Sequence, residues 1–407
     1  MKKINNNSLF SNVMSFIFVF FFLFGIKIAC LDLSVFVPLF ILFLATRNSI
    51  KFNKQVLSVA FLIAILMIYQ NVLQLFLQTF DFDSLLRLFR AVMVCIMVAV
   101  IVGSAPFSSN QILSSIFYSI LFQAICIDIA AFVEPINNLL SFLSGNNRVR
   151  VLRASGFLAG FDIAGLFCII GSLMLSLKIY THRSNLILLI FHIIFGLGSF
   201  FTSRVSMVLF ILVFALVNST MLFNSKKNVL YKVFIFIVLS FFIIFISWKY
   251  IVPIVAVTFS LGLINVSDDL CLEIVSRHAV QPDVNKFLLW PNMFFLPDSV
   301  WGLVFGTGVN VMDSDVGYVK DIFRYGLVGV IYSFAIYFYI YNLANSVLKR
   351  CEIRYYLIFL TIIFSMVFLL TFKNNYFFTR GIFPFIMLVV CVPIIHIREV
   401  NLKLASK

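Results

Sequence analysis

The sequence predicts an all-α polytopic integral membrane protein, and two observations lead to that class. Of its 407 residues, 62% are hydrophobic and only 11% are charged, which gives a mean hydropathy of +1.10. A soluble protein of this length could not cover so much apolar surface. The apolar residues also form long unbroken runs, whereas the strands of a membrane β-barrel alternate with a period of two.

Twelve apolar runs are long enough, or nearly long enough, to cross a hydrocarbon core of about 30 Å. The expected spans are 11–30, 33–46, 56–77, 88–105, 112–132, 157–178, 186–201, 205–223, 233–252, 322–345, 355–372 and 381–397. The runs at 33–46 and 186–201 are short, so ten or eleven spans remain alternatives. The only large hydrophilic stretch, 253–321, is expected to be one extracytoplasmic loop within a single membrane domain, 1–407.

The first run follows a basic head, as in a signal peptide, but no small-x-small cleavage site follows it cleanly. We expect it to be an uncleaved first span. Twelve spans place both termini on one side, and the positive-inside rule identifies that side as cytoplasmic. The cytoplasmic segments then hold sixteen of the 30 basic residues but only two of the 16 acidic ones. The high pI therefore reflects orientation in a lipid bilayer and not a nucleic-acid partner.

Lysine predominates among the expected cytoplasmic cations, whereas arginine predominates outside. The expected outer arginines are Arg87, Arg90, Arg148, Arg150, Arg153, Arg204, Arg277, Arg324 and Arg380. The planar fork of an arginine binds phosphate or carboxylate through two hydrogen bonds. Arg204, in the turn "TSRVS", has no acidic residue within ten positions on either side. Contact with lipid headgroups, or pairing with outer acids, explains any single arginine equally well.

The outer segments also hold candidate acids and bases. Glu273 and His278 lie in "EIVSRHAVQ", which has the pattern of an amphipathic helix, and His278 is the only one of the four histidines expected outside. A lone loop histidine is more often a surface residue than a catalyst. Asp128 and Asp162 lie near the outer ends of expected spans, where neutralising a nearby arginine is an alternative to catalysis.

The stretch "FGTGVNVMDSDVGYVKDIFRYGLVG" combines glycine turns with Asp313 and Asp315. Its first glycines are not followed by Lys-Ser/Thr, so it is not a phosphate-binding P-loop. Gly326 and Gly329 are expected to allow close helix packing. The cysteine and histidine spacings suggest no metal site, and the seven cysteines form no disulfide framework.

Three of these motifs together resemble a known family. "RASGFLAGFDIAG" is similar to the Arg-x-Ser-Gly opening of a span in bacterial O-antigen polymerases and ligases, and "FFTSRVSMVLF" is similar to their Ser-Arg turn. A long outer loop with Arg and His, followed by the Gly-x-Gly, Asp, Gly-Tyr and Gly-Leu pattern, completes the resemblance. It covers about 150–345, and the flanking spans fit by number and hydropathy.

The resemblance implies a GT-C-like membrane glycosyltransferase of the bacterial inner membrane that uses neither nucleotide sugar nor metal, and no cofactor. Its substrates would be glycans on undecaprenyl diphosphate, and a chain-length regulator is an implied partner. Within the family, the small size and high hydrophobicity of the chain fit a Wzy-type polymerase slightly better than a ligase. Arginine forks would hold the lipid diphosphate, and the expected set is Arg153, Arg204, Arg277, Arg324 and Arg380.

The acceptor hydroxyl needs a base, for which His278 is the first candidate, with Glu273 or an aspartate of the 268/269 pair behind it. Asp162 and Asp315 are expected in supporting roles. The rival classes are a lipid-linked oligosaccharide flippase and an ion- or sugar-coupled transporter. A flippase should place charges through a central cavity between repeated halves, whereas these arginines gather on one expected face.

Overall fold

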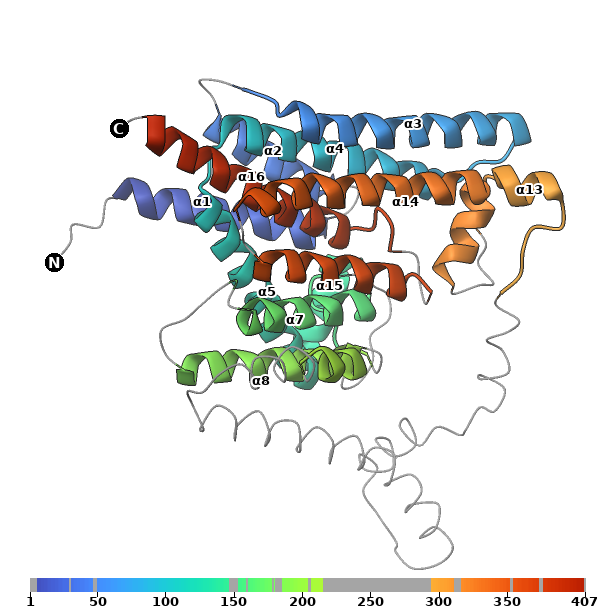
Figure 1. Cartoon of the computed structure of the whole chain (residues 1–407). Helices are drawn as coiled ribbons and strands as arrows, with labels where there is room; N and C mark the ends of the chain where they lie inside the picture. The colour runs from blue at the N-terminus through green and yellow to red at the C-terminus, as the bar shows by residue number, and fades with distance from the viewer. Residues whose placement is uncertain are drawn as a thin grey trace, which may run out of the picture. The chain divides into compact units, whose positions relative to one another are not determined.

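A computed structural model of the chain describes most of its residues (Figure 1). The described ranges are 6–28, 31–46, 50–145, 153–158, 160–177, 179, 185–203, 206–214, 294–310, 316–351, 354–372 and 376–405. The chain divides into two compact units, Met1–Phe210 with Leu296–Lys407, and Ile211–Phe295. Nearly all of the described elements belong to the first unit.

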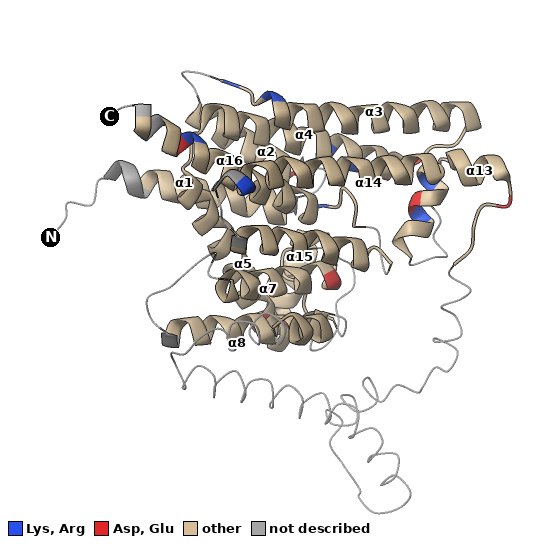
Figure 2. Cartoon of the chain, in the orientation of Figure 1, with Lys and Arg blue, Asp and Glu red and all other residues tan. Residues whose placement is uncertain are grey.

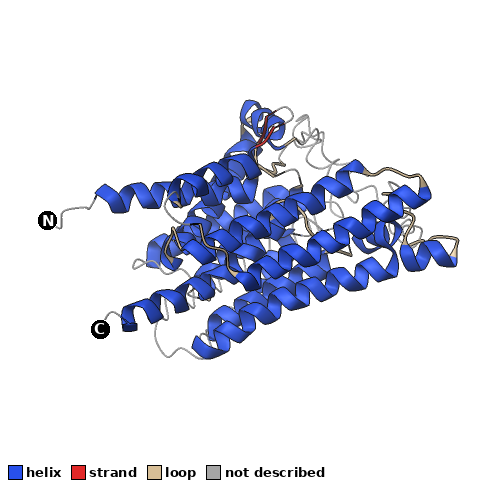
Figure 3. Cartoon of the chain, turned by 90° about the horizontal axis from the view of Figure 1, so that it is seen from above, coloured by secondary structure: helices blue, strands red, loops and turns tan. Residues whose placement is uncertain are grey.

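The regular elements in the described part of the first unit are helices and one short pair of strands, joined by loops (Figure 3). Its helices are α1 (Asn6–Phe24), α2 (Leu33–Ala45), α3 (Lys54–Leu77), α4 (Phe82–Ser104), α5 (Ser109–Phe132), α6 (Glu134–Ser144), α7 (Phe161–Ser176), α8 (Asn185–Thr202), α13 (Val300–Phe305), α14 (Gly317–Cys351), α15 (Arg354–Leu370) and α16 (Ile382–Ala405). Strands β1 (Lys27–Ile28) and β2 (Leu31–Asp32) pair antiparallel between α1 and α2.

Five of the described helices are long and apolar enough to cross a membrane: α3, α4, α5, α14 and α16. Five shorter helices, α1, α2, α7, α8 and α15, are also apolar. Large apolar side chains remain exposed on them, for example Phe40 on α2 and Phe61 on α3. Helices with this composition and this exposed surface are typical of an all-α membrane protein.

Described helical residues overlap eleven of the twelve expected spans. The expected span 205–223 is described only as far as residue 214, where residues 206–214 are helical, and 233–252 lies outside the described residues. The sequence did not predict α6 or α13, because neither helix is long enough to give a spanning run. Helix α4 begins at Phe82, several residues before the expected start at 88, and therefore includes Arg87.

Polar caps set where several of these helices begin. The side chains of Asn53 and Asp81 accept hydrogen bonds from backbone N–H groups in the first turns of α3 and α4. Ser108 and Gln111 form a reciprocal capping box at the start of α5. Each cap satisfies a donor that the first helical turn leaves free, which is worth about 1 kcal/mol.

Contacts between turns separate the helix ends into two groups. At one end, which we call the lysine-rich end, Lys51 N–H donates to Ser104 Oγ (2.9 Å) and Ser109 Oγ donates to Glu399 (2.8 Å). At the other, which we call the arginine-rich end, Gly317 N–H donates to Thr371 O (3.0 Å). Each of these contacts joins segments that are expected on the same side of the membrane.

Helix α14 is broken near its start by Gly326, which has φ +66° and ψ −178°. A Cβ added there would meet Val304 O, and it would lie 2.5 Å from Gly306 N. Helix α13 can therefore approach the backbone of α14 closely only because this residue has no side chain. This agrees with the packing role expected for Gly326.

Candidate functional site

Charged residues are few among the described residues, as the small coloured parts of the ribbon in Figure 2 show. Five arginines are described near the arginine-rich end: Arg87, Arg90, Arg153, Arg324 and Arg380. Two of them meet one carboxylate. Arg90 Nη2 lies 2.6 Å from Asp32 Oδ2, and Arg380 Nη2 lies 3.5 Å from Asp32 Oδ1. We call these three residues the Asp32 cluster, and it carries one formal positive charge.

The fold brings the Asp32 cluster together from three distant segments. Asp32 ends β2 and caps α2, where its Oδ1 accepts hydrogen bonds from Ser34 N–H (3.1 Å) and Ser34 Oγ (2.5 Å). Arg380 arrives on the turn before α16, and Gly25 makes room for it. A Cβ at Gly25 would lie 2.5 Å from Arg380 Nε, and its φ of +40° also favours glycine.

Aromatic packing fixes the turn that carries Arg380. Phe377 and Phe378 pack against Tyr337 of α14, with ring centroids 5.0 and 5.7 Å away. Phe378 N–H also donates to the Tyr337 hydroxyl (3.2 Å). Arg380 therefore projects from a rigid support and not from a free loop, which is the arrangement that a binding site needs.

The environment of the cluster shifts two pKa values. Burial raises the pKa of Asp32, but the charges of Arg380 and Arg90 and the bonds from Ser34 outweigh it, so the pKa lies below its usual range. Burial lowers the pKa of Arg380 to about 10, although Asp32 opposes that shift. The Nε and Nη2 atoms of Arg380 are buried and donate no hydrogen bond. An incomplete set of partners around a buried cation favours an anionic ligand.

Arg153 opens the segment 153–158, which packs between α5 and the end of α8. Ala154 N–H donates to Phe201 O (3.1 Å), and Gln123 Nε2 of α5 donates to Ser155 O (2.9 Å). The Arg-x-Ser-Gly segment therefore lies directly beside the helix end that precedes the Ser-Arg turn. Leu158, the last residue of the segment 153–158, lies close to the turn that carries Arg380. A Cβ added to Gly381 would lie 3.1 Å from Leu158 Cδ2.

Asp162 lies in the first turn of α7, and its carbonyl accepts a hydrogen bond from Ser206 Oγ (3.5 Å). Its charge adds to burial in raising the pKa of Tyr376, whose hydroxyl is buried without a hydrogen bond. Asp128 has no arginine partner shown among the described residues, and its expected pairing stays a prediction. Its Oδ1 is buried without a hydrogen bond, 3.6 Å from the position of a Cβ on Gly198.

Arg324 lies in a second group of polar side chains, formed by α3, α4 and the first part of α14. Its Nε lies 3.4 Å from Asp81 Oδ2, and its side chain is only 3% exposed. Ser84 Oγ hydrogen bonds with the Tyr325 hydroxyl (3.1 Å) and accepts from Gln70 Nε2 (2.6 Å). We call Gln70, Gln74, Asp81, Ser84, Arg87, Asp321, Arg324 and Tyr325 the Arg324 cluster.

The Gly-x-Gly segment covers the Arg324 cluster on one side. Thr307 N–H donates to Phe323 O (2.6 Å), and Gln74 Nε2 donates to Gly308 O (3.1 Å). Gly308 has φ +73°, so the segment turns tightly against the end of α3. The motif therefore lies against the polar side chains next to Arg324.

The remaining expected site residues lie outside the described residues: Arg204, Glu273, Arg277, His278 and Asp315. Their roles stay predictions. Within the described part of the chain, no group of three His, Cys, Asp or Glu side chains could hold a metal ion.

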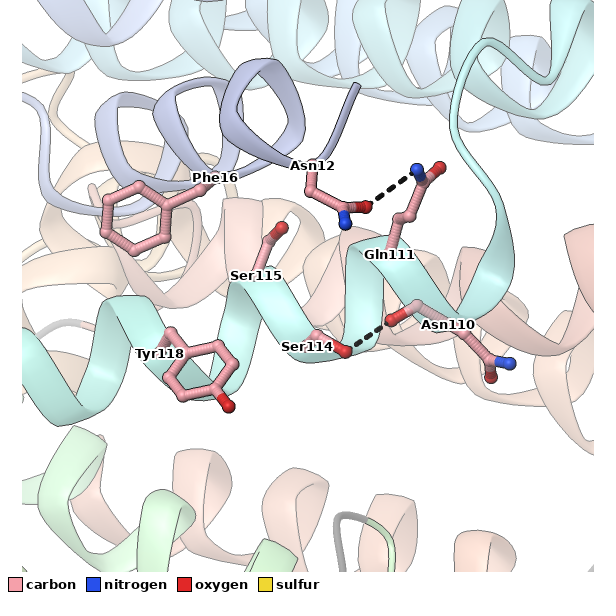
Figure 4. Close-up of a pocket in the computed structure, with 7 residues that line it drawn as sticks. All are labelled: Asn12, Phe16, Asn110, Gln111, Ser114, Ser115 and Tyr118. Carbon is pink, nitrogen blue, oxygen red and sulfur yellow. Dashed lines mark hydrogen bonds between the residues drawn. The ribbon is translucent and has the colours of Figure 1, made fainter. Parts of the chain in front are cut away.

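An uncharged pocket of about 360 Å³ lies at the lysine-rich end, between α1 and α5 (Figure 4). Its lining residues are Asn12, Phe16, Asn110, Gln111, Ser114, Ser115 and Tyr118. Gln111 Nε2 donates to Asn12 Oδ1 (2.9 Å) across the gap between the two helices, and Ser114 Oγ donates to Asn110 O (2.7 Å). The pocket offers no cation for a diphosphate, so its chemistry differs from that of the arginine-rich end.

The sequence reasoning missed Asp32, Asp81 and the two glutamines as site residues. Gln70 and Gln74 stand one turn apart inside an apolar span, and buried amides at that spacing are an available signal of a polar site. Asp32 and Asp81 directly precede apolar helices, where a helix cap is the simpler interpretation. Only the tertiary contacts show that each also meets an arginine.

Comparisons with known protein families and with curated proteins found no match for this chain.

Proposed function

We propose that this chain is a membrane-embedded glycosyltransferase that joins repeat units carried on undecaprenyl diphosphate into a surface polysaccharide. The reaction would take place at the extracytoplasmic face of a bacterial inner membrane, and both termini would be cytoplasmic. The proposal includes about twelve spans and a GT-C-like arrangement, in which the shorter apolar helices also cross the bilayer. The motif resemblance and the charge partition of the sequence motivate it.

One observation carries the proposal. The Asp32 cluster has one excess positive charge, at the end of the helices that is expected to face outward. Arg380 Nε has no hydrogen-bond partner, and Arg380 Nη2 has only the 3.5 Å ion pair with Asp32. The Arg-x-Ser-Gly segment reaches the same turn through Leu158 and Gly381. A lipid diphosphate lies at headgroup depth and offers oxygens that accept hydrogen bonds, so its charge and position match this cluster.

In the proposed reaction, a hydroxyl of one repeat unit attacks the anomeric carbon of the other. The bond between that carbon and the phosphate oxygen breaks, and its electron pair leaves with the lipid diphosphate. Arginines would stabilise this developing charge, with Arg380 and Arg153 as described candidates and Arg204 and Arg277 as further ones. The hydroxyl proton would pass to a base, for which His278 is the first candidate and Glu273 the second.

A gene deletion followed by gel analysis of surface polysaccharide tests the proposal. We expect a product with a single repeat unit, which complementation with the native gene restores to long chains. Complementation with Arg380→Ala, Arg153→Ala or Arg204→Ala should fail while the protein is still expressed. Lys54→Ala is the matched control, because Lys54 is an exposed cation at the lysine-rich end.

The other outcomes separate the rival classes. Complete loss of surface glycan on deletion would indicate a ligase acting on lipid A core, or a lipid-linked oligosaccharide flippase. An unchanged gel would contradict any role in glycan assembly and would favour a transporter.

A further inference from the structure

The Arg324 cluster contains unpartnered hydrogen-bonding groups of both kinds. The Nη1 atoms of Arg87 and Arg324 are buried and donate no hydrogen bond. The Oε1 atoms of Gln70 and Gln74 are buried and accept none. Each such group has lost its hydrogen bonds to water on burial without gaining a partner in the protein. Four such groups lie on the adjoining helices α3, α4 and α14 (Figure 1). They indicate a site for a ligand that both donates and accepts hydrogen bonds.

The charges of this cluster balance, unlike those of the Asp32 cluster. Arg324 pairs with Asp81, and Arg87 lies close enough to Asp321 and Asp81 for electrostatic interaction. A phosphate would satisfy the two guanidinium nitrogens, but it would meet two carboxylates and would leave both amide oxygens without a donor. The balance of charge therefore disfavours a second phosphate site.

Hydroxyl groups fit this combination of partners. A hydroxyl donates one hydrogen bond and accepts two, so neighbouring hydroxyls of a sugar ring satisfy guanidinium donors and amide acceptors together. Arg87 and Asp81 are partly exposed, whereas the other members of the cluster are buried, so a ligand would have to approach from the side of Arg87 and Asp81. Ordered water could satisfy the same groups, and the experiment below separates the two.

The two clusters adjoin on one helix. Arg87 and Arg90 are three positions apart on α4, so their side chains are neighbours, about 5–6 Å apart at Cβ. Arg90 belongs to the charged Asp32 cluster and Arg87 to the neutral one. A phosphate held by Arg90 and Arg380 would therefore place a group attached to it within reach of Arg87.

We propose that the Arg324 cluster binds the hydroxyls of the sugar that is attached directly to the lipid diphosphate, while the Asp32 cluster binds the diphosphate itself. This inference rests on the proposed function. The inference divides recognition of a lipid-linked glycan between a cluster with a net positive charge and a cluster with no net charge. Arg87, Arg324, Gln70 and Gln74 are its sugar-binding residues.

Binding of two probes to the purified full-length protein in lipid nanodiscs tests the division. The probes are farnesyl diphosphate, which has no sugar, and the lipid-linked repeat unit extracted from the deletion strain. Arg87→Lys keeps the charge but removes the fork of donors. We expect it to weaken binding of the glycan lipid about ten-fold and to leave the affinity for farnesyl diphosphate within about two-fold. Arg90→Lys should weaken both, and Lys54→Gln should change neither.

Gln74→Met provides a second variant without a change of charge, and it carries the test if Arg87→Lys does not elute as a monodisperse protein. Equal weakening of both probes by these variants would overturn the inference, because the cluster would then act on the diphosphate. No effect on either probe would also overturn it, because water would then be the occupant. If the unmodified protein bound neither probe, the proposed function itself would fail, and the inference with it.

Discussion

At the scale of single residues, the most informative feature is a carboxylate that stands between two arginines. Asp32 is partly buried, caps a helix and is in contact with Arg90 and Arg380. In the absence of substrate it serves as the counter-ion of both. If a diphosphate binds the same guanidinium groups, as proposed, it would compete with Asp32, which would then influence both the stability of the protein and its affinity for the anion.

Asp32→Asn should destabilise the protein and strengthen anion binding. Removing one member of a partly buried ion pair leaves two guanidinium groups without their counter-ion, which we expect to lower the free energy of unfolding by about 2 kcal/mol. Thermal unfolding in detergent, with and without inorganic diphosphate, measures both effects. The diphosphate should raise the melting temperature more in the variant. Asp298→Asn, a change at an exposed position, is the control.

The pH dependence of that difference follows from the direction of the pKa shift. Because the pKa of Asp32 lies below its usual range, the contribution of Asp32 to the free energy of unfolding is complete above its unfolded-state pKa of about 3.9. It is lost as the pH falls through the lower, folded-state pKa. The free energies of unfolding of the parent protein and of Asp32→Asn should therefore differ by the same amount at pH 8 and at pH 5. The two values should converge only in stronger acid. Convergence already between pH 8 and pH 5 would contradict this account.

At the scale of elements, hydropathy predicted most of the described helices, since a run that crosses a membrane must be long and apolar. It could not predict features that depend on contacts between segments. The start of α4 was placed too late because Asp83 and Arg87 interrupt its apolar run, whereas the cap by Asp81 starts the helix before them. Helix α6 was missed because it lies outside every spanning run, although Pro135 and Gly145 mark its ends.

Gly326→Ala tests the break in α14. A side chain there would have to adopt a conformation that favours glycine and would also collide with the backbone of α13. We expect the variant to lose about 3 kcal/mol of stability. Gly160→Ala is the matched control, since its φ is −128° and the nearest atom to an added Cβ is Ile163 Cδ1 at 3.4 Å. Equal melting temperatures for the two variants would show that the close approach is not required.

At the scale of the whole molecule, the sequence predicts which turns share a side of the membrane, and this assignment stays a prediction. It rests on the order of charges alone, because the positive-inside rule depends on composition near the spans. The candidate site was only partly predictable. Arg380 and Arg153 were predicted from their expected outer positions. Their neighbours could not be predicted, because Asp32, Arg90 and Arg380 are far apart in the sequence and meet only in the fold.

Cysteine labelling measures the sidedness directly. In a cysteine-free background, Asp298→Cys should react with a membrane-impermeant maleimide in intact spheroplasts, because the segment before α13 is exposed and expected outside. Lys54→Cys should react only after the membrane is permeabilised. The reverse pattern would invert the topology and would place the Asp32 cluster on the cytoplasmic side, away from any extracytoplasmic glycan.

Helix α6 gives the molecule a further property. Its exposed side chains include Leu139 and Phe142, while its other face packs on α5 and on the strand pair near Asp32. A short amphipathic helix of this kind rests in the interfacial layer of a bilayer and responds to lipid packing and curvature. We therefore expect lateral pressure in the outer leaflet to be transmitted to the strand pair, so that the composition of the surrounding lipids would set how readily the neighbouring arginines accept a headgroup.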